Sequence, residues 1–309
     1  MNIALYISTV LIWGSTWLAI AWQVGEVAVP VSVFYRFAIA ALVLMAALSL
    51  FRRRQSLQLT DHLYCLLQGI CVFALNFYCF YVAAGYLPSG LIAILFSMST
   101  LFNAVNGFLF FRTPVPRVFY LALALGLPGM ALIFWQDLMA VEATWTLLGA
   151  VGLSLLGTYG FSLGNMVSVR HQRRGLHINT TNAFAMFYGA VFMGSIALIQ
   201  GVSFSLPAEP RYLGALVYLG VVGSVGGFGL YFMLVGRIGA GKAAYATVLF
   251  PLVALALSTA FEGYRWHAHG LIGLAMIVSG NLLMFNAHRS VWRWLLARAG
   301  RAAPVRSET

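Results

Sequence analysis

Charged side chains are scarce in this chain of 309 residues. Asp, Glu, Lys and Arg make up 8% of it, and only 7 residues are acidic. An ordinary soluble domain is about 25% charged and about 45–50% apolar, whereas 61% of this chain is apolar. So few charges cannot cover the surface of a soluble protein. The composition therefore excludes a cytosolic enzyme and indicates an integral membrane protein.

Cysteine and mid-membrane acids are scarce too. Cys65, Cys71 and Cys79 fall in one apolar segment, and in a helix they lie about 9 and 12 Å apart, which is too far for a disulfide. No Asp or Glu falls near the middle of an apolar segment, so a proton relay through the bilayer has no obvious carrier. We expect no metal and no cofactor, since the pair His267 and His269 points in two directions on a helix.

Ten apolar segments remain when the sequence is divided at charges, prolines and glycine-rich turns. Each is 19 to 25 residues long, and about 20 residues cross a hydrocarbon core of about 30 Å. They are too long and continuous for barrel strands. The sequence predicts an all-α integral membrane fold with ten transmembrane helices. The segments are 3–22, 30–50, 62–84, 88–111, 118–136, 146–168, 178–200, 212–236, 241–261 and 267–288.

The basic residues predict the orientation of these helices. With the N-terminus inside, 15 Lys and Arg residues lie in cytoplasmic loops and the tail, only Arg211 and Arg265 lie outside, and Arg36 falls within a segment. Cytoplasmic loops normally carry such an excess. Both termini are therefore expected in the cytoplasm, in a bacterial-type inner membrane. Topology accounts for the basic excess, and no nucleic-acid partner is expected.

The two halves resemble each other at an offset of about 150 residues. Residues 33–37 align with 183–187, and 81–85 with 232–236. Five spans per half is an odd number, so the second copy must be inverted in the membrane. We expect two inverted five-helix repeats, at 1–137 and 146–288, followed by a basic cytoplasmic tail at 289–309. Inverted repeats are typical of secondary transporters.

Short motifs in these segments resemble those of the drug/metabolite transporter superfamily, and most closely its ten-helix EamA type. The first half carries Trp13-Gly14-Ser15, residues 35–42 and 84–90, and the second half carries 236–244, 249–251 and 261–263. The resemblance implies export of amino acids or other small metabolites, as by the YddG-like amino-acid exporters. The halves are not equivalent, because Met186 replaces the counterpart of Arg36 and Glu262 that of Arg112.

Arg36 and two tryptophans are the first candidate site residues. A charge inside a segment must face protein or a wet cavity, so Arg36 either clamps a substrate carboxylate or binds carbonyl groups that hold the bundle. Trp13 and Trp17 share a helix face, and Trp13 is too deep for an interfacial belt. They either line a cavity or pack between helices.

Polar side chains on two further segments complete the candidate site. Ser99, Asn103 and Asn106 form a stripe with Phe96 one turn earlier, and a similar stripe recurs in the segment 146–168. Such stripes cannot face lipid; they line a pore or bond between helices. Tyr78, in the segment 62–84, lies near mid-depth and, like Trp13, either lines a cavity or packs between helices. The candidate cavity lining is Trp13, Trp17, Arg36, Tyr78, Phe96, Ser99, Asn103, Thr158, Ser162 and Asn165.

The sequence thus favours a secondary transporter that exports small metabolites, with neutral or aromatic amino acids as cargo, by alternating access between the repeats. The alternatives are an exporter of another small organic metabolite or a drug, and a channel-like facilitator. A membrane enzyme is disfavoured, because it needs acid, base or metal-binding groups clustered at one depth, and the histidines are scattered. The expected partners are a small-molecule substrate and the lipid bilayer, and the chain is compatible with a monomer.

Overall fold

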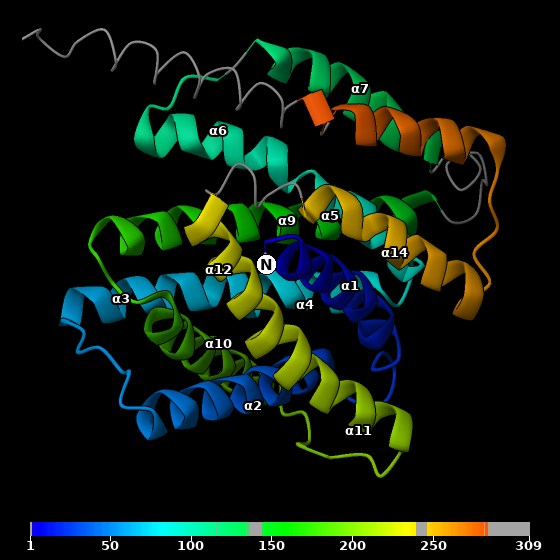
Figure 1. Ribbon diagram of the computed structural model, residues 1–309. Coiled ribbons are helices and arrows are strands. Elements are labelled where there is room, and N and C mark those ends of the chain that lie inside the picture. The colour runs from blue at the N-terminus through cyan, green and yellow to red at the C-terminus, as the bar shows by residue number, and fades with distance from the viewer. Residues whose placement is uncertain are drawn as a thin grey trace, which may run out of the picture.

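The computed structural model describes residues 2–115, 117–133, 135, 144–238, 246–280 and 282–283, and over this part of the chain it contains helices and no strands (Figure 1). Seven helical stretches are long and apolar enough to cross a membrane. They comprise α1 (Asn2–Ala21), α2 (Val29–Leu50), α3 (Leu59–Gln68) with η1 (Gly69–Leu75) and α4 (Asn76–Ala83), α5 (Ser89–Ser97) with α6 (Ser99–Phe111), α9 (Thr144–Arg173), α10 (Ile178–Ile199), and α11 (Pro210–Val217) with η2 (Tyr218–Gly226) and α12 (Gly227–Ile238).

Three shorter apolar helices occupy the remaining predicted segments. They are α7 (Val118–Ile133), α14 (Ala246–Phe261) and the helix Ala268–Gly280. Parts of these three segments, and the whole of the tail 289–309, lie outside the described residues. The all-helical membrane fold is confirmed, whereas the count of ten spans and the cytoplasmic placement of both termini stay predictions.

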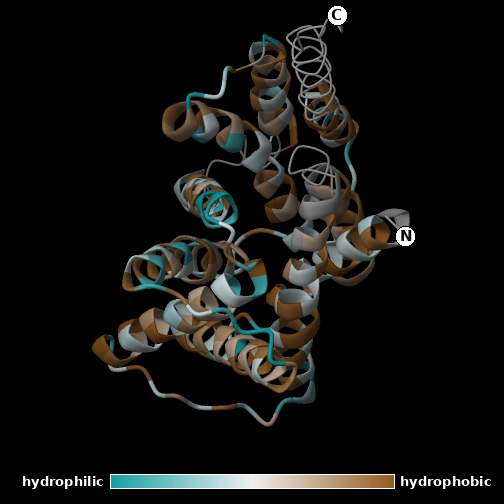
Figure 2. Cartoon of the chain, turned by 60° about the vertical axis from the view of Figure 1, so that its left-hand side comes forward, coloured by the Kyte–Doolittle hydropathy of each residue, from teal (hydrophilic) through white to brown (hydrophobic). Residues whose placement is uncertain are grey.

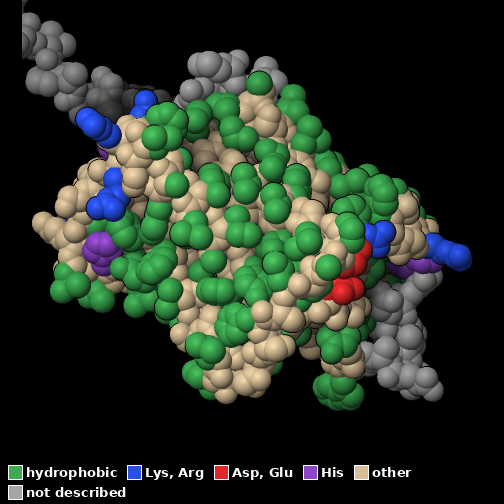
Figure 3. Space-filling model, turned by 90° about the horizontal axis from the view of Figure 1, so that it is seen from below, with side chains coloured by type: hydrophobic (Ala, Val, Ile, Leu, Met, Phe, Trp, Pro, Cys, Tyr) green, Lys and Arg blue, Asp and Glu red, His purple; other side chains and the backbone are tan. Residues whose placement is uncertain are grey.

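The surface is apolar where a soluble protein would be polar. Leu42, Leu198 and Ile199 are 69%, 70% and 85% exposed, while Arg36 and Asn106 are buried. Figure 2 shows hydrophobic residues along the helices and hydrophilic ones chiefly at helix ends and in the connections. On the face drawn in Figure 3, the charged side chains gather at two opposite ends with a broad uncharged zone between them. This distribution fits a chain surrounded by lipid.

Close backbone approach at glycines holds two of the helix pairs together. A Cβ on Gly69 would lie 2.9 Å from the backbone nitrogen of Gly189, so η1 and α10 touch backbone to backbone. A Cβ on Gly129 would lie 2.8 Å from the carbonyl oxygen of Gly273, which brings α7 against the last helix. Small residues allow such contacts, which replace the hydrophobic effect as the source of helix association in lipid.

The helix contacts recur between the two halves. α1 packs on α14, and the corresponding contact, with the roles of the halves exchanged, is that of α9 with α6. Likewise, η1 and α4 contact α9, and their counterparts η2 and α12 contact α1. α2 packs on α10 near the bottom of Figure 1. Two π-helical segments, η1 and η2, interrupt the α-helices about 150 residues apart. In η2 the Ser224 hydroxyl donates to the carbonyl oxygen of Leu219, five residues earlier, at 2.8 Å.

Candidate functional site

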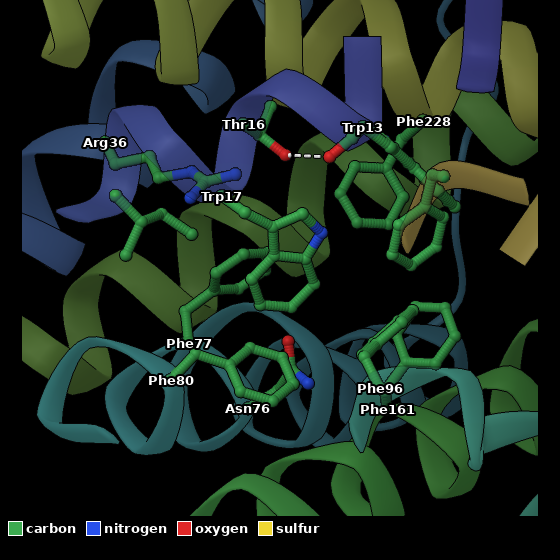
Figure 4. A pocket seen from close by; sticks show the side chains of 12 residues that line it. Trp13, Thr16, Trp17, Arg36, Asn76, Phe77, Phe80, Phe96, Phe161 and Phe228 are labelled. Carbon is green, nitrogen blue, oxygen red and sulfur yellow. Dashed lines mark hydrogen bonds between the residues drawn. The ribbon is translucent and has the colours of Figure 1, made fainter. Parts of the chain in front are cut away.

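A small cavity lies where α1, α2, α4, α5, α9, α12 and α14 converge (Figure 4). Its volume is about 40 Å³, which is room for about three water molecules. Six phenylalanines and two tryptophans dominate its walls. The lining residues are Trp13, Thr16, Trp17, Ile20, Arg36, Asn76, Phe77, Phe80, Phe96, Phe161, Phe228 and Phe250.

The two tryptophans of α1 organise the aromatic walls. Four residues apart, Trp13 and Trp17 project from one face of the helix. The Trp13 ring meets Phe228 edge to face, with 5.2 Å between ring centroids, and Trp17 meets Phe80 in the same way at 5.0 Å. Trp17 also stacks on Phe250 at 6.1 Å. These are the favourable aromatic geometries, so the walls form a packed aromatic box around a small hollow.

Arg36 brings the one charge into this box. It is 2% exposed; its Nε donates to the Ser224 hydroxyl at 3.2 Å, and its guanidinium carbon lies 4.1 Å from the centroid of the Phe77 ring. Its Nη1 has no hydrogen-bond partner, and no carboxylate of the described residues pairs with it. A buried cation is strongly unfavourable without a partner. The Nη1 group is thus a buried donor that has no hydrogen-bond partner.

Asn76 lines the same cavity and has an unpaired hydrogen-bond acceptor. Its Nδ2 donates to the carbonyl oxygen of Gly157 at 2.8 Å, which fixes the amide and joins α4 to α9. Its Oδ1 is buried and has no hydrogen-bond partner. The cavity thus combines an unpaired donor on Arg36, an unpaired acceptor on Asn76 and aromatic walls.

Four of the ten sequence-predicted residues meet at the cavity: Trp13, Trp17, Arg36 and Phe96. The polar stripes lie between α6 and α9 instead. Ser162 donates to Asn103 Oδ1 at 2.8 Å and accepts from Asn106 Nδ2 at 2.9 Å. Asn165 also donates to Asn103 Oδ1, at 3.3 Å. These side chains bond helix to helix, which was the second interpretation that the sequence left open.

The other three predicted residues also lie apart from the cavity lining. The Thr158 hydroxyl donates to the carbonyl of Ser154 at 2.7 Å, within its own helix. Ser99 is buried at the start of α6, and Tyr78 is half-buried against the core. That these six residues line a substrate path stays a prediction.

Most of the phenylalanines in the lining were missed by sequence reasoning. A signal existed for one of them, because Asn76 must avoid lipid and Phe80, four residues on, shares its face. Tyr78 lies on a different face of that helix. Phe161, Phe228 and Phe250 look like any other phenylalanine of an apolar segment, and the sequence offered nothing to single them out.

Comparison with known proteins identifies related chains. The family model described as the EamA-like transporter family matches residues 1–135 and 144–286. Protein PagO of Salmonella typhimurium is 22% identical over 288 residues, which cover 92% of each chain. One crystal structure, 18% identical, covers 93% of this chain and 98% of the other with a TM-score of 0.63. At this identity the structural likeness supports the fold alone.

Proposed function

Because the chain belongs to the EamA-like transporter family, we propose that it exports small zwitterionic metabolites, namely neutral or aromatic amino acids, through the aromatic cavity by alternating access. Carriage of small molecules follows from the family. The cargo and the mechanism are inferences from the site, and the direction rests on the resemblance to amino-acid exporters.

The two unpaired polar atoms of the cavity carry the cargo assignment. Arg36 Nη1 lacks an acceptor and Asn76 Oδ1 lacks a donor. The carboxylate of an amino acid accepts from a guanidinium, and its ammonium group donates to an amide oxygen. An aromatic side chain would then pack among Trp13, Trp17 and Phe250. The same arginine disfavours cationic drugs, because like charges repel in a low-dielectric site.

The cavity volume supports alternating access. Ligand pockets normally measure about 300–1,000 Å³, whereas this cavity holds about 40 Å³ and is too small for an aromatic amino acid. The conformation is therefore a closed one, and cargo enters when the walls separate. The recurring contacts between the halves support a second arrangement of similar energy, in which the two halves exchange roles. A permanently open channel fits these packed walls poorly.

Counterflow in proteoliposomes tests the cargo assignment. Vesicles preloaded with phenylalanine should accumulate labelled phenylalanine, and competition should require both polar groups of the competitor. Phenethylamine lacks the carboxylate and 3-phenylpropionate lacks the amine. Each should compete about 10–100-fold less well, because hydrogen bonds to charged groups contribute about 1.5–3 kcal/mol. If phenylalanine, phenethylamine and 3-phenylpropionate competed equally well, Arg36 and Asn76 would not recognise the carboxylate and the ammonium group of the cargo.

A matched pair of variants completes the test. Arg36→Gln should abolish counterflow of phenylalanine, whereas Arg211→Gln, which removes an exposed arginine, should leave it unchanged. Binding of labelled phenylalanine to the purified Arg36 variant separates lost recognition from lost folding. If the wild-type chain accumulates none of a panel of amino acids above empty vesicles, the cargo is another class of metabolite.

A further inference from the structure

A cleft of about 900 Å³ opens at the end of the molecule where α2 ends and α10 begins. Its rim includes the consecutive residues Arg52, Arg53 and Arg54, all exposed. Its apolar lining residues are Leu48 on α2, Met233 on α12, and Leu176 and Ile178 at the start of α10. The cleft is separate from the aromatic cavity, and transport as proposed above does not use it.

The positive charge of this rim is uncompensated within the described part of the chain. No Asp or Glu lines the cleft, and none of the three arginines forms an ion pair with a described residue. Asp61 is the carboxylate nearest in sequence, and it pairs with Arg170 and Arg174 instead. The rim thus presents three guanidinium groups that have no anion of their own.

Hydrogen bonds fix the segment that carries these arginines. Gln55 Oε1 accepts from the backbone nitrogen of His177 at 2.6 Å, and the backbone nitrogen of Gln55 donates to Thr180 Oγ1 at 3.3 Å. The segment is therefore fastened to the start of α10, which also lines the cleft. The unpaired backbone N–H groups of a first helical turn favour an anion, and they add to the charge of the arginines.

The cleft also has apolar lining residues beside the charged rim. Leu48 is 7% exposed and Met233 is 47% exposed. α12 makes contacts with η2 and α1, and the cleft separates its Met233 from the end of α2. A molecule that fills the cleft must therefore be anionic at the rim and apolar along the wall.

We propose that the cleft binds one anionic phospholipid of the inner leaflet, with its phosphate headgroup on Arg52, Arg53 and Arg54 and an acyl chain between Leu48 and Met233. Basic pockets between helices at the cytoplasmic face are suited to such headgroups. Arginine suits a phosphate because its guanidinium donates two parallel hydrogen bonds. The bound lipid fills the gap beside α12, and so it holds α12 in place. Phe228 on the same helix lines the aromatic cavity.

Thermal unfolding of the delipidated full-length chain in neutral detergent tests this site. Dioctanoyl phosphatidylglycerol should raise the melting temperature saturably, dioctanoyl phosphatidylcholine should not, and inorganic phosphate should act only at far higher concentration. The triple variant R52Q/R53Q/R54Q should bind phosphatidylglycerol about 100-fold more weakly, because each basic side chain near an anionic headgroup contributes about fivefold. An equal shift with inorganic phosphate at the same concentration would assign the rim to free anions and overturn the lipid assignment.

A second triple variant, R289Q/R293Q/R298Q, removes the same charge from the tail, which lies outside the described residues. It should leave the phosphatidylglycerol shift unchanged. If both triple variants lose the shift equally, the effect is a general attraction of basic chains for anionic lipid, and the cleft is not a site.

A labelling experiment with the native rim covers the case in which the triple variant fails to fold. A fluorophore on Met233→Cys should be quenched about fivefold more by brominated phosphatidylglycerol than by brominated phosphatidylcholine, as expected if the anionic headgroup supplies about 1 kcal/mol of preference. A fluorophore on Leu198→Cys, on an exposed apolar surface, should be quenched equally by both lipids. Equal quenching at both positions would contradict the proposal.

Discussion

Replacing Asp61 with Ala should destabilise the folded chain by about 2–3 kcal/mol. Breaking a fully buried ion pair by removing one partner costs more, about 3–5 kcal/mol. The Asp61 side chain is 3% exposed and accepts from Arg174 Nη1 at 2.9 Å and from Arg170 Nη1 at 3.2 Å. It also accepts weakly, at 3.4 Å, from the backbone nitrogen of Gln58 at the start of α3. The expected cost for Asp61 is lower because Arg170 and Arg174 are 21% and 42% exposed, so water can partly replace the lost carboxylate.

Unfolding by sodium dodecyl sulfate in mixed micelles measures this free energy. Glu209→Ala is the matched control, since Glu209 Oε2 accepts from the Tyr212 backbone nitrogen at 2.6 Å at the start of α11 and pairs with no described cation. Loss of such a cap costs about 1 kcal/mol. If Asp61→Ala costs no more than this control, the ion pairs contribute nothing and the reasoning is refuted. A double-mutant cycle with Arg174→Ala should give a coupling of about 1–2 kcal/mol if the pairs act as described.

Two further substitutions test the helix packing. Gly69→Ala should sharply reduce the yield of monodisperse protein in size-exclusion chromatography, because its Cβ would collide with the α10 backbone, whereas Gly107→Ala, with open space around it, should behave as wild type. Ser162→Ala should destabilise the chain by about 1–2 kcal/mol, because it leaves the buried Nδ2 of Asn106 on α6 without its partner. The control Ser195→Ala removes a hydroxyl that bonds only its own helix and should change the unfolding free energy by less than about 0.5 kcal/mol; equal losses at the two serines would contradict the interhelical network.

The helical segments were predictable because burial in lipid leaves the backbone only one local solution. The irregularities within them were not. The segment 88–111 reads as one helix, yet α5 ends at Ser97 and α6 begins at Ser99. The Ser97 hydroxyl donates to the Ile94 carbonyl at 2.6 Å, a local bond of the kind that competes with the helix. Such a bond depends on tertiary packing as well as on residue type, so the sequence alone could not locate the break.

The same limit explains why the sequence assigned the polar stripes to the cavity lining, whereas in the structure they lie between α6 and α9. The sequence pattern shows only that Asn103, Asn106 and Ser162 must lie on helix faces that avoid lipid. Facing a cavity and facing another helix satisfy this requirement equally well. In the structure α6 and α9 hydrogen-bond to one another through Asn103, Asn106 and Ser162, although Asn106 Oδ1 is buried without a partner.

Arg36 has a structural contact that the structure shows, and its contact with a cargo carboxylate stays a prediction. Its Nε bonds Ser224 of η2, which is the structural role, while its Nη1 stays unpaired at the cavity. We infer that the two roles depend on each other, because the bond to Ser224 sets the orientation of the guanidinium. Ser224→Ala should therefore weaken phenylalanine counterflow while leaving the charge of the site intact. If this variant transports as wild type, the orientation of Arg36 does not matter and its charge alone attracts the cargo.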